Sequence, residues 1–555
     1  MIRVFLLAVL LLVFMPFKAQ TITNADASLK NTGEAKKPAL VVGIVVDQMR
    51  YDYLTRFSDK YTDGGFKRLI REGFNCEDAN FNYIPTYTAV GHTSIYTGTT
   101  PENHGIISND WYDKYLKKSI YCVDDDTYYT IGAEKGGKKS PNRMAVTTIT
   151  DEVHLSQGRK GKVIGISIKD RAAILPAGHT ANAAYWFEGG NDGKFITSSF
   201  YMNQLPKWVV DFNNSGIAEK YMNTTWNTLY DIATYTESIE DDNPFEGTFK
   251  GMDRPMFPYN LKKIRKDNGN FELLKAIPFG NSILEDFAEA TVKGEELGKD
   301  AYTDFLAVSF SSTDYVGHRF GVDSKEVEDT YLRLDKDLSD FLTFLDTYVG
   351  KGNYLLFLTA DHAAVQVPSY LQSLKIPAGY FDEDGFKEFL NTTAKSLYGT
   401  DAIIENVSNF QVFLNREKLD ELHLDLNKVE QDLSDRIINF NGIYKVVTAH
   451  TLQSASFNDG ILAALQQGYN QKLSGDILMV PYPATIDYSK TGSTHGSAYT
   501  YDTHVPLIFY GKGIKKGATG RYIPIPDIAA TLANLLQVNY PSGCTGNVIE
   551  EAIDK

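Results

Sequence analysis

Apolar runs of strand length recur along the chain, and polar residues follow most of them. The first run, 39–46 (ALVVGIVV), is apolar throughout, which is typical of a strand buried on both faces of a parallel sheet. Similar strands are predicted at 162–169, 305–314, 354–361 and 505–510. Apolar residues at helical spacing predict helices at 281–298, 324–345 and 526–536. This alternation predicts an α/β fold with a doubly wound, mostly parallel sheet flanked by helices.

Two segments depart from the alternation. Residues 182–270 are rich in Tyr, Phe, Trp and Asn, with few helical periods, and predict a cap insertion near the entrance of a site. Residues 363–487 have their own strand, helix and strand pattern and predict a small α/β subdomain. The core of the fold is therefore expected to comprise 39–181, 271–362 and 488–555.

The first twenty residues have the pattern of a secretory signal peptide. Arg3 precedes the apolar run 4–14, and the segment ends with the small residue Ala19 before Gln20. The alternative, an uncleaved membrane anchor, is less favoured because the run is shorter than the ~20 residues that span a bilayer. We expect a signal peptide over 1–20, a polar linker over 21–38, and a periplasmic or secreted protein with no membrane anchor after cleavage.

Composition and charge narrow the class of protein. Of the 555 residues, 43% are hydrophobic and 23% charged, which excludes a disordered, collagen-like or coiled-coil chain. The formal net charge of −15 leaves no general basic surface for nucleic acid. The three cysteines allow at most one internal disulfide, and Cys76 with Cys122 is the more plausible pair. No pattern specifies an oligomeric state.

Aspartates and histidines gather where strands are predicted to end. Asp47 follows the first strand, Asp361 and His362 follow another, and Asp314 and His318 lie four residues apart after a third. The carboxyl ends of parallel strands meet at one edge of an open sheet, where ligands bind. With His495 in the segment GSTHG, four distant segments are expected to meet there.

These six side chains have the chemistry of metal ligands. Zn²⁺ is bound by histidine nitrogens and carboxylate oxygens in sets of three or four, so six groups suffice for two ions. Taken singly, each residue is more commonly a strand-end cap or a hydrogen-bonded histidine. Their shared placement favours the metal site. His92 is expected to support a local turn or helix.

A hydroxyl-rich loop runs into a predicted helix at Thr88, within 84–95. A hydroxyl at a helix start lies near free backbone N–H donors and a dipole that favours an oxyanion. A metal ion would make such a threonine a nucleophile. The alternative is a simple N-cap threonine.

The same motifs carry a family resemblance. Thr88 within PTYTAVGH, followed in order by TGTTPENHG, DYVGH, ADH and THG, resembles the alkaline phosphatase superfamily on its nucleotide pyrophosphatase/phosphodiesterase side. The segment IKDR, with Lys169 and Arg171, looks like the Lys-x-Arg pair of phosphate-irrepressible alkaline phosphatases of the PafA type. The loop after Thr88 reads Ala-Val-Gly-His where many diesterases of the superfamily have Phe-Pro-Asn-His.

The resemblance implies two zinc ions per chain and a role for each residue. One ion would be held by Asp314, His318 and His495. The other would be held by Asp47, Asp361 and His362, with Thr88 Oγ as its fourth ligand. Thr88 would be the nucleophile that forms a phosphothreonine, and the non-bridging phosphoryl oxygens would be bound by Asn109, Lys169 and Arg171.

The charge of the substrate favours a phosphate monoesterase. A monoester is a dianion with one charge more than a diester, and Lys169 and Arg171 supply compensating charge. The alternative for this pair is a solvated strand end. The nearest rival function is a phosphodiesterase or nucleotide pyrophosphatase with the same two-zinc site. A sulfatase, a cofactor-independent phosphomutase and a non-catalytic binding protein are less favoured. The expected substrates are small phosphate monoesters.

Overall fold

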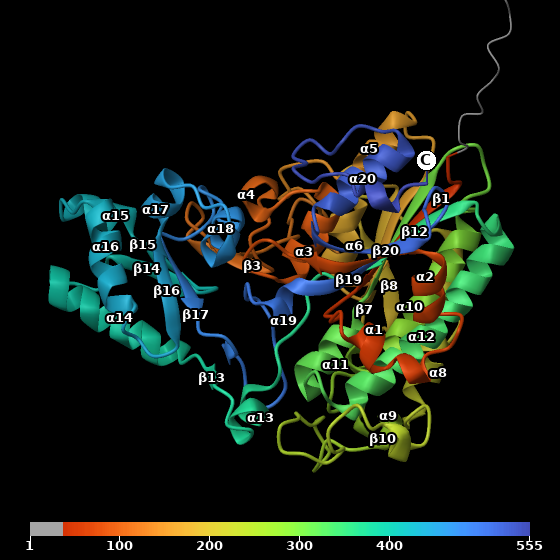
Figure 1. Ribbon diagram of the computed structural model, residues 1–555, viewed down its shortest axis with the longest axis horizontal. Coiled ribbons are helices and arrows are strands. Elements are labelled where there is room, and N and C mark those ends of the chain that lie inside the picture. Colours follow the sequence, from red (N-terminus) through yellow and green to blue (C-terminus); the bar gives the residue numbers. More distant parts are fainter. Residues whose placement is uncertain (1–36, 555) are drawn as a thin grey trace, which may run out of the picture. The chain divides into compact units, whose positions relative to one another are not determined.

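A ten-stranded mixed sheet forms the centre of the computed structural model, which describes residues 37–554 (Figure 1). Five neighbouring strands at its middle are parallel: β12 (Tyr354–Thr359), β1 (Leu40–Val46), β11 (Asp304–Phe310), β6 (Val163–Ser167) and β7 (Ala183–Glu188). Their apolar residues are buried on both faces, as the continuous apolar runs predict.

Antiparallel pairing extends the sheet at both margins. On one side, β19 (His504–Gly511) runs antiparallel to β12 and to β2 (Phe74–Asn80), which pairs with β20 (Gly517–Pro524). On the other, β8 (Lys194–Ser198) joins β7 and the short β5 (Thr130–Ile131). The predicted doubly wound α/β fold is confirmed, with mixed pairing at its margins.

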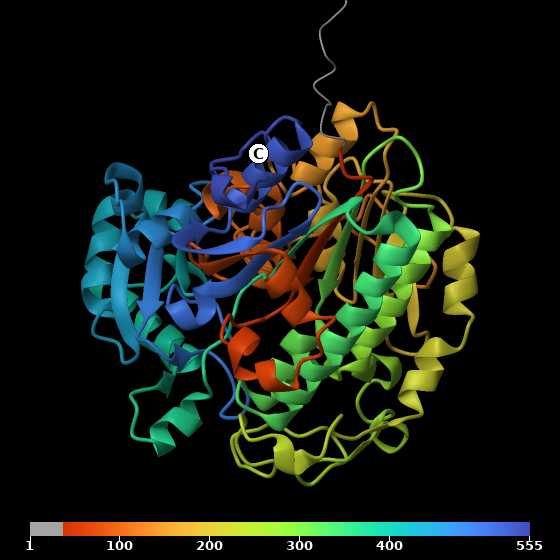
Figure 2. The same cartoon turned by 45° about the vertical axis from the view of Figure 1, so that its right-hand side comes forward.

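Two sets of helices flank the sheet (Figure 2). One contains α10 (Phe279–Gly294), α11 (Ser312–Phe320) and α12 (Lys325–Leu345). The other contains α3 (Thr88–Thr97), α5 (Ile149–Ser156), α6 (Asp170–Ala177) and α20 (Asp527–Leu536). The Ser324 hydroxyl accepts a hydrogen bond from Val327 N at the start of α12, which fixes where this helix begins.

A second, four-stranded antiparallel sheet lies within the segment 363–487. Its strand order is β14-β15-β17-β16, with bounds Ile404–Ser408, Gln411–Leu414, Ile477–Pro481 and Ile443–Thr448. Helices α14 (Glu383–Tyr398) and α16 (Leu426–Ile437) pack on it around an apolar cluster distinct from the main core. The hydroxyl of Tyr112 on β3 (Asp110–Asp113) donates to Glu405 at 2.9 Å and joins this sheet to the core.

The boundary expected for the aromatic-rich insertion 182–270 is wrong at its start. Strands β7 and β8 lie in the central sheet, where Tyr185 and Phe187 are buried. The aromatic content of this stretch therefore partly reflects strand burial, because large rings fill the space between sheet and helices. Outside the sheet, the later part has only short elements, including α7 (Lys207–Asn213), α8 (Ile217–Met222), β9 (Thr225–Trp226), β10 (Tyr259–Asn260) and α9 (Leu261–Ile264).

Cys76 and Cys122, the more plausible of the possible disulfide pairs, are not bonded, because all three cysteines are free thiols. Cys76 lies on β2 in the main core, whereas Cys122 belongs to a separate apolar cluster around Trp111. Both behave as small apolar side chains, and burial raises the pKa of the Cys76 thiol to about 12.

The expected signal peptide, 1–20, and nearly all of the linker 21–38 lie outside the described residues. Within 37–554, no helix is both long enough and apolar enough to cross a bilayer.

Candidate functional site

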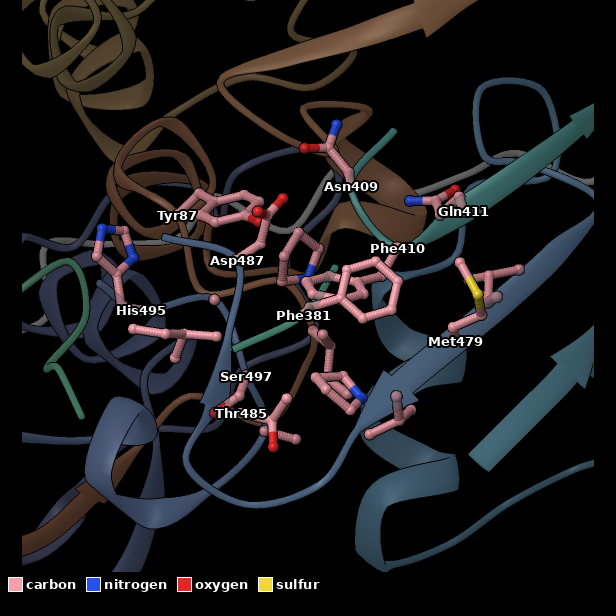
Figure 3. Close-up of a pocket in the computed structure, with 18 of the residues that line it drawn as sticks. Tyr87, Phe381, Asn409, Phe410, Gln411, Met479, Thr485, Asp487, His495 and Ser497 are labelled. Atoms are coloured by element: carbon pink, nitrogen blue, oxygen red, sulfur yellow. The ribbon is translucent and has the colours of Figure 1, made fainter. Parts of the chain in front are cut away.

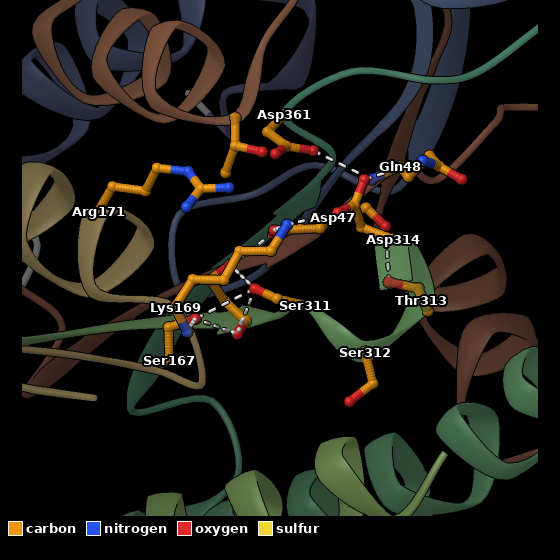
Figure 4. Close-up of polar contacts among 12 residues, drawn as sticks. Asp47, Gln48, Ser167, Lys169, Arg171, Ser311, Ser312, Thr313, Asp314 and Asp361 are labelled. Atoms are coloured by element: carbon orange, nitrogen blue, oxygen red, sulfur yellow. Dashed lines mark hydrogen bonds and ion pairs between the residues drawn. The ribbon is translucent and has the colours of Figure 1, made fainter. Parts of the chain in front are cut away.

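The carboxyl ends of β1, β11 and β12 bring the expected aspartates together (Figure 4). Asp47 directly follows β1; its N–H donates to Phe310 O at 2.9 Å, and its carbonyl accepts from the Thr313 hydroxyl at 2.6 Å. Asp314 lies in the first turn of α11, directly after β11, and Asp361 follows β12 by one residue. The three carboxylates are buried, with at most 3% of each residue exposed.

Gln48 connects two of these carboxylates. Its backbone N–H donates to Asp361 Oδ1 at 3.0 Å and its side-chain amide donates to Asp314 Oδ1 at 2.8 Å. The φ of Gln48 is +63°, a left-handed conformation that turns the chain away from β1. Gly317 makes room for it, because a Cβ there would lie 1.8 Å from Gln48 Oε1.

The three expected histidine ligands are held in one tautomer. The Nδ1 atoms of His318, His362 and His495 donate to the carbonyls of Ser493 (2.7 Å), Ala363 (3.0 Å) and Thr86 (2.6 Å). Each Nε2 is therefore left with a lone pair, as in a metal-binding histidine whose other nitrogen is hydrogen-bonded. These Nε2 atoms face carboxylate oxygens at 3.2 Å (His318 to Asp314), 3.2 Å (His362 to Asp361) and 3.7 Å (His495 to Asp314).

Three buried atoms at this position make no hydrogen bond within the described residues. Asp47 Oδ2, Asp361 Oδ2 and His362 Nε2 are buried and accept or donate no hydrogen bond within the described residues. Lys169 Nζ is 2.6 Å from Asp314 Oδ2 and 3.0 Å from Asp47 Oδ2, the second contact lying outside hydrogen-bonding geometry. One ammonium does not neutralise three buried carboxylates, so the donor set fits bound cations.

The electrostatics agree with a cation site. Burial acts to raise the pKa of Asp314, but His318 and Lys169 outweigh it and hold that pKa well below the usual range. Burial and the neighbouring His362 and His318 hold the pKa of His495 well below its usual value, so its imidazole is neutral at pH 7. Burial acts to lower the pKa of His362, yet the neighbouring Asp361 outweighs it and raises that pKa.

Possible ligand atoms form two close groups. Asp314, His362 and His495 place one ligand atom each within 4.8 Å of one another, as do Asp47, His92 and Asp361. His92 is not available as a ligand, because its Nδ1 pairs with Thr88 O and its Nε2 with Ser309 Oγ, each at 2.9 Å. It supports the start of α3, as expected.

Thr88 is the first residue of α3, at the positive end of the helix dipole, and is 99% buried. The carboxamide oxygen of Asn109 accepts from Ala89 N at 2.9 Å, so Asn109 lies beside Thr88 with its Nδ2 free to donate. Helix α3 approaches the aspartates closely at Gly91, where a Cβ would lie 2.0 Å from Asp361 O.

Lys169 and Arg171 reach the site from the start of α6 (Figure 4). Arg171 is half-buried, and its Nη1 donates to the Tyr121 hydroxyl at 3.0 Å. Its Nε is buried and has no hydrogen-bond partner within the described residues, so one donor remains unused beside the site. The structure thus brings together all ten residues predicted from the sequence.

Sequence reasoning missed three supporting residues. Gln48 bridges two carboxylates, Ser309 donates to Asp47 Oδ1 at 2.6 Å, and Tyr121 contacts Arg171. Gln48 was recognisable from its place directly after Asp47. Ser309 and Tyr121 carried no signal, because hydroxyls are common and their partners lie far away in sequence.

Comparisons with known proteins agree with this geometry. The family model described as type I phosphodiesterase/nucleotide pyrophosphatase matches residues 41–504. The chain is 44% identical to alkaline phosphatase PafA of Elizabethkingia meningoseptica, over 95% of this chain and 96% of the relative. It is 44% identical to alkaline phosphatase PhoV of Synechococcus elongatus, over 93% of each chain. A protein of Myroides odoratus named calcium-transporting ATPase is 45% identical over 98% of this chain and its own full length.

The fold comparison gives the same assignment. The crystal structure of wild-type alkaline phosphatase PafA superposes with a TM-score of 0.90 and 44% identity, covering 93% of this chain and 99% of the other. The chain therefore belongs to the type I phosphodiesterase/nucleotide pyrophosphatase family, within which it is an alkaline phosphatase of the PafA type.

Proposed function

We propose that this alkaline phosphatase hydrolyses small phosphate monoesters with two zinc ions and a phosphothreonine intermediate on Thr88, in the periplasm or outside the cell. One ion would be held by Asp314, His318 and His495. The other would be held by Asp47, Asp361 and His362, with Thr88 Oγ1 as a further ligand. The location rests on the signal-peptide pattern of residues 1–20.

The observation that carries this proposal is the set of aligned, unpartnered ligand atoms. Three histidines present Nε2 lone pairs toward the buried carboxylates of Asp314 and Asp361, with Asp47 beside them. Within residues 37–554, only Lys169 lies among these groups as a cation. The mixture of imidazole nitrogen and carboxylate oxygen suits zinc better than Mg²⁺ or Ca²⁺, which prefer oxygen ligands.

The chain's own residues account for the order of bond changes. When bound, the ions would lower the pKa of the Thr88 hydroxyl and neutralise charge on the departing oxygen. Thr88 Oγ1 loses its proton and attacks phosphorus, the bond from phosphorus to the ester oxygen breaks, and that oxygen takes up a proton as the alcohol leaves. Water then attacks the phosphothreonine, which releases inorganic phosphate and restores the Thr88 hydroxyl. The Asn109 amide donates to a non-bridging oxygen.

Lys169 and Arg171 favour a monoester over a diester. The dianionic phosphoryl group of a monoester would draw Lys169 from the carboxylates and would accept from the unused Nε of Arg171. The competing function, diester or pyrophosphate hydrolysis at the same ions, is suggested by the description of the matching family model. The two functions differ in how much they need these two positive charges.

The test is kcat/KM for an aryl phosphate monoester and for the matching methyl aryl diester. Lys169→Ala and Arg171→Ala should each lower the monoester value about tenfold to a hundredfold and the diester value much less. Lys207→Ala, whose side chain is 87% exposed, is the control. Equal losses for both substrates would favour the diesterase.

Thr88 is tested through the covalent intermediate. Thr88→Ala should lower kcat at least about a thousandfold and abolish the phosphopeptide trapped by acid quench, whereas Thr88→Ser keeps a hydroxyl and should keep both. A Thr88→Ala enzyme that still formed the phosphopeptide would contradict the assignment.

A further inference from the structure

A second cavity adjoins the candidate active site (Figure 3). It has a volume of about 140 Å³ and lies between the four-stranded sheet and the loops of the core that carry Tyr87 and His495. One side is formed by the β14–β15 hairpin and the end of β17, the other by residues 84–87 and 494–502.

Tyr87 and His495 border both this cavity and the candidate phosphoryl site. Tyr87 immediately precedes Thr88, and its ring lies edge-to-face against His495, with centroids 5.7 Å apart. His495 lines the cavity while its Nε2 faces Asp314 at 3.7 Å. The cavity therefore lies directly beside the position expected for the phosphoryl group at Thr88.

The lining is apolar, and its charged side chains are all acidic. Phe381, Phe410 and Met479 contribute large apolar surfaces. Among the described residues that line it, none is Lys or Arg, whereas three carry carboxyl groups: Glu383, Asp487 and Asp502. Such a lining suits an apolar group that is neutral or positively charged and repels an anion.

Asp502 places a buried carboxyl group in the cavity lining. It is 1% exposed; its Oδ2 accepts from Ser497 N and Oγ at 2.8 and 2.6 Å, but its Oδ1 has no partner within the described residues. A buried carboxyl oxygen without a partner is unfavourable unless a ligand or water satisfies it.

The hairpin that carries Phe410 has an unusual turn. Asn409 and Phe410 both have positive φ, +52° and +55°, in a two-residue hairpin where the second position normally favours glycine. Phenylalanine is strained there, and strain of this kind persists at functional sites. The Asn409 amide donates to Asp110 O at 2.7 Å, which fixes the tip to the residue next to Asn109, and the Phe410 ring packs on Phe381 with centroids 4.9 Å apart.

We propose that this cavity binds the organic group of the phosphate monoester and selects apolar alcohols or phenols without negative charge. Phe381, Phe410 and Met479 would contact the group, and Glu383 with Asp487 would disfavour anionic ones. The assignment rests on the proposed function only in placing the phosphoryl group between Thr88 and His495.

The decisive measurement is binding, which requires no turnover. Zinc-loaded enzyme is titrated calorimetrically with ethylphosphonate and with pentylphosphonate, which differ only in the apolar chain. Pentylphosphonate should bind about tenfold more tightly. Phe410→Ala and Phe410→Gly should remove most of that ratio and leave ethylphosphonate binding unchanged.

The glycine variant separates binding from folding. Because glycine relieves the backbone strain at position 410, its loss of the chain-length preference would not reflect a weakened hairpin. Tyr482→Ala, which changes an exposed tyrosine directly after β17 and outside the cavity lining, is the matched control and should behave as wild type.

A charge series at constant length tests the acidic residues. The kcat/KM for pentyl phosphate and 5-aminopentyl phosphate should exceed that for the phosphate ester of 5-hydroxypentanoate about tenfold, and Asp487→Asn with Glu383→Gln should narrow the gap. Equal binding of both phosphonates, or a preference untouched by Phe410→Gly, would overturn the proposal. A monoester that binds with the expected preference but is not hydrolysed would count against the proposed chemistry and leave the cavity assignment standing.

Discussion

At the scale of single residues, the site depends on side chains that hold the functional groups in place. Arg171 is an example, because Tyr121 fixes its guanidinium. The phenol accepts from Arg171 Nη1 at 3.0 Å and donates to Asp170 Oδ1 at 2.5 Å. The hairpin of β3 and β4 (Lys118–Tyr121) pairs Asp110 with Tyr121, so the same hairpin positions Asn109 and the support of Arg171.

This arrangement makes Tyr121→Phe informative. Loss of the hydroxyl leaves Arg171 and Asp170 without their common partner, and kcat/KM for a monoester should fall about threefold to tenfold. The diester value should change little, because its phosphoryl group carries one charge fewer. Tyr115→Phe, on the exposed turn of the same hairpin, is the control. A parallel fall for both substrates would indicate general damage to the hairpin instead.

At the scale of elements, the close approach of α3 to the end of β12 sets the position of Thr88. It depends on Gly91, since a Cβ there would lie 2.0 Å from the Asp361 carbonyl oxygen, a backbone atom that has little freedom to move. Gly91→Ala should therefore displace Thr88 from the aspartates.

The expected result is a loss of about 1–3 kcal/mol in the free energy of unfolding, together with at least a tenfold fall in kcat. Urea denaturation and initial rates measure the two effects. Gly379→Ala, whose new Cβ would have only ordinary contacts at 3.6 Å and beyond, should leave both unchanged. Wild-type kcat in Gly91→Ala would show that α3 tolerates a shift.

A buried carboxyl group, Glu285, lies where helices α10 and α12 pack together, and we expect it to make the stability of the fold depend on pH. Burial and then Asp337 raise the pKa of Glu285 on α10 to about 9, and its Oε1 has no partner within the described residues. Between its ordinary pKa of 4.5 and about pH 9, the folded state retains a proton that the unfolded chain releases. The contribution of this group to stability therefore falls as pH rises through that window.

Glu285→Gln removes this proton linkage and should stabilise the protein relative to wild type by at least about 1 kcal/mol more at pH 9 than at pH 5. Thermal unfolding at the two pH values, with kcat as a check that the site is intact, measures the difference. If Glu285→Gln differed from wild type in stability by the same amount at pH 5 and at pH 9, Glu285 would be shown to titrate as an exposed carboxyl does.

The elements differ in how far sequence could predict them. Continuous apolar runs gave β1 and β12, because burial on both faces leaves no other pattern, and the aspartates after them could be placed by topology alone. The elements at the margins of the sheet were harder to predict from the sequence. Strand β7 has an aromatic composition that resembles an insertion, and the strain at Phe410 depends on a turn that sequence does not specify. Tyr121 and Ser309 act through contacts that only the fold creates.

At the scale of the whole molecule, the fold gathers carboxylates from three strands into one buried region. This placement is unfavourable for the chain alone, because three buried charges face a single ammonium. A ligand that binds only the folded state stabilises it in proportion to RT ln(1 + [L]/Kd). The stability of the whole chain should therefore depend on bound cations and not only on its apolar core.

Chelation tests this coupling. Removing metal should lower the melting temperature by several degrees, since free ligand at a hundred times its Kd is worth about 2.7 kcal/mol. Zinc should restore it. Ca²⁺ and Mg²⁺ should not, because three of the seven proposed protein donors are imidazole nitrogens. Asp314→Asn should reduce the zinc-dependent increment, because it removes one of the three charges that the cation offsets. A melting temperature insensitive to chelation, in protein shown to have lost its metal, would mean that Lys169 alone balances the buried carboxylates, and that the ions serve the reaction without supporting the fold.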